Sequence, residues 1–166
     1  MNPDDWLLLC RTVRFGDTDA AGVMHFHQLL RWCHEAWEES LERYGIAAGL
    51  IFPWAALVPA AEPTTAEGQA AQPAAPAVAL PIVHCSADYR RPLRCGDPLT
   101  IRLEPHRLDP MSFEVRYRFS RADEEVARGL LRHLGIDAAS RQRCALPEPI
   151  SRWLEASGLG GGIQPL

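Results

Sequence analysis

The segment from about Phe26 to Tyr44 constrains the fold more than any other part of the chain. Its apolar residues recur every three or four positions, which predicts one long amphipathic helix. The apolar stripe comprises Phe26, Leu29, Leu30, Cys33, Ala36, Trp37, Ser40, Leu41 and Tyr44. The opposite face carries Gln28, Arg31, Glu35, Glu38, Glu39, Glu42 and Arg43. Gly45 follows directly and suits the left-handed cap that ends a helix. Because the stripe is wide, we expect a sheet to wrap over it.

Strand-like segments with alternating apolar residues flank this helix, one before it and four after it. They span residues 6–15, 80–89, 99–104, 113–120 and 125–137, and a short helix is predicted near 149–157. In the first segment, Leu9, Val13 and Phe15 share one face. Short turn-forming separators imply hairpins, so the sheet should be antiparallel. We therefore expect an α+β fold with one long helix against a five-stranded antiparallel sheet. The arginines that alternate on the other sheet face then lie in solvent or at a subunit interface.

The chain of 166 residues fits a single domain spanning 1–166. Residues 59–79 are built from Ala, Pro, Glu, Thr and Gln, and we expect a mobile loop because they offer little apolar surface to offset the entropy of ordering. The Gly-rich residues 158–166 predict a flexible tail. No segment resembles a membrane helix or a signal peptide, and the five scattered cysteines suit reduced thiols, so we expect a cytoplasmic protein that does not bind membranes.

The charged residues narrow the classes of function. The net charge of −4 gives no indication of nucleic-acid binding. The chain contains no lysine, and all 17 basic residues are arginines. A Schiff-base lysine and a P-loop lysine are therefore excluded. Any phosphate on a ligand must be bound by arginine, histidine or backbone N–H groups.

The turn that precedes the helix, Phe15 to His27, is the candidate site. Asp17 and Asp19 can serve simply as turn residues that accept backbone N–H bonds. The start of a helix, however, carries a partial positive charge and N–H groups that lack helical partners. A thioester carbonyl bound to the N–H groups near Phe26 would be polarised. A neighbouring carboxylate could then attack it or activate water, and the residues alone do not distinguish Asp17 from Asp19.

Other catalytic arrangements fit the sequence less well. A Gly-x-Ser-x-Gly elbow, a Cys-x-x-Cys pair and a His-Glu-x-x-His motif are all absent, so we expect no metal and no cofactor. His25 and His27 are two positions apart and on a helix would not face one ligand. They either line the pocket or lie partly exposed at the helix start. Arg90 and Arg91 precede Pro92 at a strand end, where they either bind a phosphate or are solvated.

Two segments resemble hotdog-fold thioesterases of the 4-hydroxybenzoyl-CoA type: Phe15-Gly16-Asp17-Thr18-Asp19-Ala20-Ala21-Gly22, and the later run from Ala87 to Asp97. Within this group, the run from Met24 to His27 and the run from Arg31 to Ser40 resemble the cyanobacterial 1,4-dihydroxy-2-naphthoyl-CoA thioesterase branch. The resemblance implies a helix wrapped by a curved sheet, and homodimers or homotetramers with sites at the subunit interface. It assigns the catalytic carboxylate to the second acid, Asp19, and leaves Asp17 to shape the turn. It places the carbonyl-polarising N–H close to Phe26. The long loop after Pro59 departs from the family pattern.

The expected activity is hydrolysis of an aromatic acyl-CoA. The resemblance implies 1,4-dihydroxy-2-naphthoyl-CoA as the substrate, with 1,4-dihydroxy-2-naphthoate and CoA as products, on the route to phylloquinone (vitamin K1). The expected substrate-binding residues are Gly22, Val23, His25, His27, Arg90 and Arg91. Two alternatives remain open: a thioesterase of broad specificity for acyl-CoA or acyl-carrier substrates, and a non-catalytic module that binds acyl-CoA.

Overall fold

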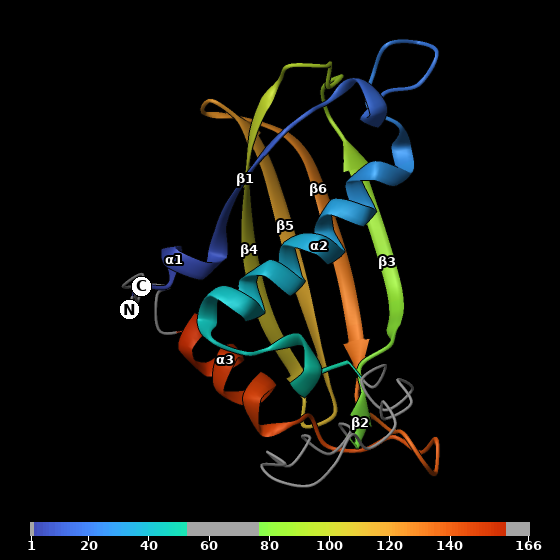
Figure 1. Cartoon of the computed structure of the whole chain (residues 1–166), viewed down its shortest axis with the longest axis vertical. Helices are drawn as coiled ribbons and strands as arrows, with labels where there is room; N and C mark the ends of the chain where they lie inside the picture. The colour runs from blue at the N-terminus through green and yellow to red at the C-terminus, as the bar shows by residue number, and fades with distance from the viewer. Residues whose placement is uncertain (1, 53–76, 159–166) are drawn as a thin grey trace, which may run out of the picture.

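The structure is a computed structural model that describes residues 2–52 and 77–158. Its five-stranded sheet has the order β1-β4-β5-β6-β3, and every neighbouring pair is antiparallel. The strands are β1 (Leu8–Thr12), β3 (Ile82–Tyr89), β4 (Pro98–Asp109), β5 (Ser112–Arg121) and β6 (Glu124–Leu134). The helix α2 (Phe26–Tyr44) lies across one sheet face, with α3 (Glu148–Gly158) beside its second half (Figure 1). The predicted α+β architecture is confirmed.

The long helix begins and ends where the sequence predicts. Gly45 caps it with a positive φ of 101°, and its N–H bonds back to the carbonyl of Glu42. The buried face is wider than predicted: Gln28 was expected on the polar face but is buried, and Trp32 is buried too. Phe26 was predicted in the apolar stripe but is 69% exposed, since the first turn lies at the sheet edge beside β3.

The N-terminal segment differs from the prediction of one strand over residues 6–15. A short helix, α1 (Asp4–Leu7), comes first, and β1 covers only Leu8–Thr12. Pro3 followed by two acids is typical of a helix start. Trp6 is buried there and donates from Nε1 to Ser157 Oγ at 3.0 Å. Leu9 and Val13 are fully buried as expected.

Phe15 was predicted to share the buried face with Leu9 and Val13, and this was wrong. It is 85% exposed because the chain leaves the strand and turns into the 3₁₀ segment η1 (Phe15–Asp17). Strand periodicity therefore no longer applies to it.

The strands that follow the helix keep the predicted alternation. Leu99, Ile101 and Leu103 are buried, and so are Phe113, Val115, Tyr117 and Phe119. The segment 125–137 is divided at Gly135 into β6 and the two-residue β7 (Ile136–Asp137). β7 pairs with β2 (Val78–Ala79), so the last residues of the expected loop 59–79 form a strand. Residues 59–76 of that loop and residues 159–166 of the expected tail lie outside the described residues, and Gly158 ends α3 instead of starting the tail.

The outer sheet face carries paired charges. Arg118 contacts Glu104 at 2.8 Å and Arg128 contacts Glu125 at 2.6 Å. Glu114 is 3% exposed and accepts from Arg116 and Arg132 at 2.9 and 3.0 Å. The alternating arginines thus bind carboxylates of their own strand or of a neighbouring one.

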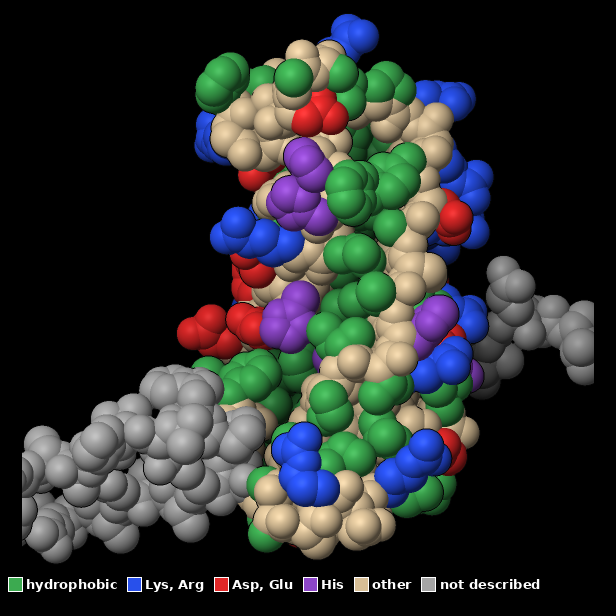
Figure 2. Space-filling view, turned by 90° about the vertical axis from the view of Figure 1, so that its right-hand side faces the viewer, with side chains coloured by type: hydrophobic (Ala, Val, Ile, Leu, Met, Phe, Trp, Pro, Cys, Tyr) green, Lys and Arg blue, Asp and Glu red, His purple; other side chains and the backbone are tan. Residues whose placement is uncertain are grey.

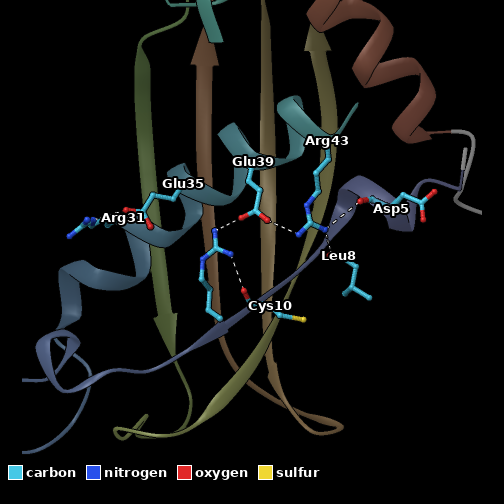
Figure 3. A network of polar contacts seen from close by, with 8 residues as sticks. Asp5, Leu8, Cys10, Arg31, Glu35, Glu39 and Arg43 are labelled. Carbon is cyan, nitrogen blue, oxygen red and sulfur yellow. Dashed lines mark hydrogen bonds and ion pairs between the residues drawn. The ribbon is translucent and has the colours of Figure 1, made fainter. Parts of the chain in front are cut away.

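An ion-pair cluster fastens the second half of α2 to β1 (Figure 3). Glu39 accepts from Arg11 at 2.7 Å and from Arg43 at 2.6 Å. Arg43 also reaches the carbonyls of Asp5 and Leu8, each at 3.4 Å. These contacts hold α2 against β1, the strand that leads into the acidic turn. The first turn of α2 is thereby fixed in position.

His133 makes folding dependent on pH. It is fully buried between Phe113, with ring centroids 4.8 Å apart, and Trp37, at 4.3 Å. Burial lowers the pKa of His133 from 6.5 to about 4. The unfolded chain therefore binds more protons between these values, and the free energy of unfolding should fall by about 3 kcal/mol as the pH decreases from 7 to 4.

Denaturant unfolding across this range tests the expectation, with His133→Phe as the matched variant. The difference in pH dependence between the two proteins isolates His133 from the carboxylates that titrate at lower pH. Parallel curves for wild type and His133→Phe would contradict the assignment.

Candidate active site

Asp17 holds the turn together. Its Oδ2 accepts the Arg14 N–H at 2.7 Å, and its backbone carbonyl accepts the His25 N–H at 2.8 Å. These bonds join the end of β1 to the residue just before α2. Asp17 therefore sets the angle at which the chain enters the helix.

Asp19 is the first residue of a tight loop that leads to the start of α2. Its N–H donates to the Val23 carbonyl at 2.9 Å, and Gly22 has a positive φ of 78° that permits the reversal. Among the described residues, only the Ala21 N–H donates to the Asp19 carboxylate, at 2.8 Å from Oδ1. The second carboxylate oxygen is available to a substrate or a water molecule.

The first turn of α2 supplies the polarising groups. His25 is the N-cap, without a side-chain capping bond, and the first turn holds no acidic residue. The Gln28 N–H bonds to the His25 carbonyl at 3.0 Å. The N–H groups of Phe26 and His27 have no helical carbonyl before them to bond. They can therefore polarise a carbonyl oxygen that binds at the start of the helix.

A groove of about 440 Å³ unites these parts, and we call it the upper groove. It lies between the start of α2 and the end of β3, and Figure 2 views this side of the molecule. Its lining residues are Asp19, Val23, Met24, Phe26, Tyr89, Arg90, Arg91, Pro92 and Leu93. The structure thus brings together five predicted site residues: Asp19, Val23, Phe26, Arg90 and Arg91. Gly22, His25 and His27 lie next to it in sequence but do not line it.

Tyr89 is a site residue that the sequence pattern did not predict. Its hydroxyl donates to the Phe26 carbonyl, so it joins the end of β3 to the first turn of α2. Burial is the main cause that raises the pKa of this hydroxyl, which therefore stays protonated near neutral pH. Its position one residue before Arg90, on the strand face shared with Ala87, is the signal that could have indicated it.

Arg90 and Arg91 form the rim of the upper groove. Both backbone N–H groups bond to the Val126 carbonyl, at 2.9 and 3.1 Å, which fixes the end of β3. Their side chains pair with Glu125 at 3.0 Å and Glu124 at 2.7 Å. Both arginines are about half exposed, so these pairs cost little to exchange for a ligand phosphate.

His25 and His27 lie closer together than helical spacing predicts, with ring centroids 4.1 Å apart. Helical spacing does not apply to this pair, because His25 precedes the helix in an extended conformation, with φ −61° and ψ 137°. The His25 Nδ1 atom is buried and finds no hydrogen-bond partner among the residues that the structure describes. Within residues 2–52 and 77–158, no three or more His, Cys, Asp or Glu side chains gather as metal ligands would.

In the same part of the chain, no helix has the length and apolar character needed to cross a bilayer. The cytoplasmic location stays a prediction.

At the level of sequence, the chain is similar to known thioesterases. Residues 13–154 match the family model described as the thioesterase-like superfamily. A protein of Prochlorococcus marinus (strain MIT 9303) named 1,4-dihydroxy-2-naphthoyl-CoA hydrolase is 57% identical, over 96% of this chain and 97% of its own length. A protein of the same name from Synechococcus sp. (strain CC9311) is 60% identical, over 95% and 94% of the two chains.

Solved structures agree with the fold. A crystal structure from Prochlorococcus marinus strain MIT 9313 is 56% identical, covers 95% of this chain and all of its own, and superposes with a TM-score of 0.83. Slr0204, a 1,4-dihydroxy-2-naphthoyl-CoA thioesterase from Synechocystis, is 28% identical over 89% of this chain and 94% of its own, with a TM-score of 0.72. The predicted hotdog fold is confirmed.

Proposed function

The chain belongs to the thioesterase-like superfamily, and from this premise we propose that it hydrolyses 1,4-dihydroxy-2-naphthoyl-CoA to 1,4-dihydroxy-2-naphthoate and CoA. The observation that carries the chemistry is the placement of Asp19 and the start of α2 on the same groove. The relatives named for this substrate support the identity of the acyl group. The product would then serve phylloquinone synthesis.

The proposal gives the helix start and Asp19 separate roles in the reaction. The thioester carbonyl oxygen lies against the N–H groups at Phe26, which stabilise the negative charge of the tetrahedral intermediate. Asp19 either attacks the carbonyl carbon or removes a proton from the attacking water. CoA leaves as the thiol after its sulfur is protonated. The Tyr89 hydroxyl holds the Phe26 carbonyl, so the first turn of the helix keeps its orientation while charge develops.

Substrate binding follows from the rim and walls of the upper groove. Val23, Met24 and Leu93 supply apolar contact near the reacting carbon. Arg90 and Arg91 meet the phosphates of CoA, because the chain has no lysine for this purpose. Gly22 keeps the Asp19 loop tight, and His25 and His27 lie at the start of the helix.

We infer that the protein acts as a homodimer built on β3, the edge strand. β3 pairs with β6 on one side only, and the described residues place no strand on its other side. Ile82, Val83 and Tyr89 are exposed apolar residues on it, and Phe26 is exposed beside it. Figure 2 shows apolar side chains running down this face. An unpaired apolar edge of this kind favours pairing with a second strand. A tetramer would pair two such dimers.

The substrate assignment is tested by kcat/KM on a panel of thioesters. The 1,4-dihydroxy-2-naphthoyl thioester should exceed benzoyl-CoA and short aliphatic acyl-CoA by at least about 100-fold, as expected for a pocket that matches two fused rings and their hydroxyl groups. Release of the thiol is followed with a thiol-reactive dye.

The other outcomes identify the alternatives. A flat profile across the panel would favour a thioesterase of broad specificity. Tight binding of acyl-CoA without release of thiol would favour the non-catalytic binding module.

A further inference from the structure

Asp97 closes the turn between β3 and β4 and lies outside the lining of the upper groove. We call residues 93–97 the bracing turn. The Asp97 Oδ2 atom accepts the Arg94 N–H at 2.8 Å and a hydrogen from Arg121 Nη1 at 2.7 Å. Gly96 has a positive φ of 95°, which permits the tight reversal. The hydrogen bond from the Arg94 N–H is the main cause that lowers the pKa of Asp97, so this carboxylate is ionised near neutral pH.

The bracing turn is bonded to the chain on both sides of the loop that carries the catalytic carboxylate (Figure 1). Before the loop, the Val13 N–H donates to the Asp97 carbonyl at 3.0 Å, and the Val13 carbonyl accepts the Gly96 N–H at 2.8 Å. After the loop, the Met24 N–H donates to the Leu93 carbonyl at 2.7 Å. Val13, Met24 and Leu93 are all buried, so water does not compete readily for these bonds. The bracing turn therefore clamps the base of the loop.

The loop itself has few other attachments. In the part of the chain that the structure describes, the backbone hydrogen bonds of residues 14–23 all stay within residues 14–25. They give the loop its shape but do not tie it to the sheet. The placement of the loop against the sheet and the start of α2 therefore depends on the bonds that the bracing turn makes at Val13 and Met24.

We propose that Asp97 is a positioning residue for catalysis: it holds the bracing turn, and through that turn it places Asp19 against the N–H groups at the start of α2. This rests on the proposed function, in which Asp19 acts on a thioester bound at that helix start. Displacing a reacting group by about 1 Å costs about 100-fold in rate. Loss of the Asp97 carboxylate should therefore slow the chemical step and change substrate binding little, because its side chain does not line the upper groove.

The chain offers a matched control at the other end of β4 (Pro98–Asp109). Asp109 closes the turn to β5 in a similar way, accepting the Met111 N–H and the Ser112 hydroxyl, each at 2.7 Å. At about 3.3 Å per residue, it lies roughly 35 Å from Asp97 along the strand. Removing either carboxylate thus costs one turn its brace, but only one of the two turns adjoins the site.

Asp97→Ala should lower kcat by about 100-fold and leave KM within about threefold of wild type. Asp109→Ala should keep kcat within about twofold. Thermal melts should show a similar loss for both variants, about 2–4 °C in Tm, as expected for one lost turn or cap. Steady-state kinetics on the thioester that the wild type cleaves fastest make the test independent of the naphthoyl assignment.

Two further variants separate positioning from a general loss of stability. Asp97→Asn keeps an oxygen for the Arg94 N–H and loses only the charge that faces Arg121, so kcat should fall by about fivefold, with Asp109→Asn unchanged. In the Asp19→Asn background, Asp97→Ala should change the residual rate by less than about twofold, because no carboxylate remains to be positioned. A general loss of stability would lower both backgrounds alike.

Circular dichroism first checks that each variant is folded, and if Asp97→Ala is not, Asp97→Asn and Asp109→Asn carry the comparison. Equal kcat losses at Asp97 and Asp109, a normal kcat in both Asp97 variants, or a full further loss in the Asp19→Asn background would overturn the proposal. Failure of the proposed function would appear separately, as an Asp19→Asn variant with near-normal kcat.

Discussion

Asp19→Asn is expected to lower kcat by at least about a thousandfold, because the amide can neither attack a thioester nor take a proton from water. The fold should persist. The amide oxygen of asparagine can accept the Ala21 N–H as Asp19 Oδ1 does at 2.8 Å, and the Asp19 N–H bond to Val23 does not involve the side chain. KM should change little, since the upper groove keeps its shape. Steady-state kinetics together with a thermal melt separate the two effects.

Asp17→Asn is the matched control in the same turn. Its Oδ2 accepts the Arg14 N–H, a structural bond that an asparagine oxygen can keep in part. We expect kcat within about tenfold of wild type and a modest loss of stability of about 1 kcal/mol. If Asp19→Asn retains near-normal kcat, or if Asp17→Asn is the more damaging change, the catalytic assignment is wrong.

The two roles left open for Asp19 differ in the fate of the water oxygen. Direct attack forms an anhydride on the carboxylate, and its hydrolysis by ¹⁸O-water can place the label on Asp19. General-base catalysis places it on the acid product in every turnover. A single turnover in ¹⁸O-water, followed by mass spectrometry of the peptide that contains Asp19, distinguishes them.

The features that local sequence determines were predicted well. The helix from Phe26 to Tyr44 and its Gly45 cap follow from periodicity and from one residue that tolerates positive φ. The strands follow from alternation. The exposure of Phe15 could not be predicted, because it depends on the hydrogen bond that the Asp17 carbonyl accepts from the His25 N–H. That bond joins residues on either side of the turn, and Phe15 lies in the η1 segment between the end of β1 and this contact.

The site, like the fold, was predictable only where its parts are neighbours in the sequence. The loop of Asp19 and the helix start adjoin in sequence, so their proximity follows from the motif. The approach of Tyr89 to the Phe26 carbonyl depends on how β3 lies beside α2, which only the folded sheet determines. The same holds for Asp97, whose turn meets both ends of the Asp19 loop only once β1 and β4 pair.

The packing of α2 against β6 includes a close approach at Gly129. Gly129→Val is expected to lower the free energy of unfolding by about 4 kcal/mol, at the upper end of overpacking effects. A Cβ atom at Gly129 would lie 2.4 Å from Cys33 Sγ, and Cys33 is fully buried. The side chain must therefore push α2 away from β6. Leu130→Val, one position along on the other sheet face, is the matched control and should cost less than about 1 kcal/mol.

The same contact should link packing to catalysis. Gly129→Ala adds only the Cβ atom, so the fold should persist with α2 displaced slightly at Cys33. The helix is rigid, and the displacement reaches the Phe26 N–H groups two turns away, where a small error in position costs about 100-fold in kcat. Cys33→Ala removes the sulfur that the new Cβ meets. The double variant should therefore regain stability and kcat together, with a coupling energy of about 1–2 kcal/mol. Simple additivity of the two substitutions would mean that this contact does not position the helix.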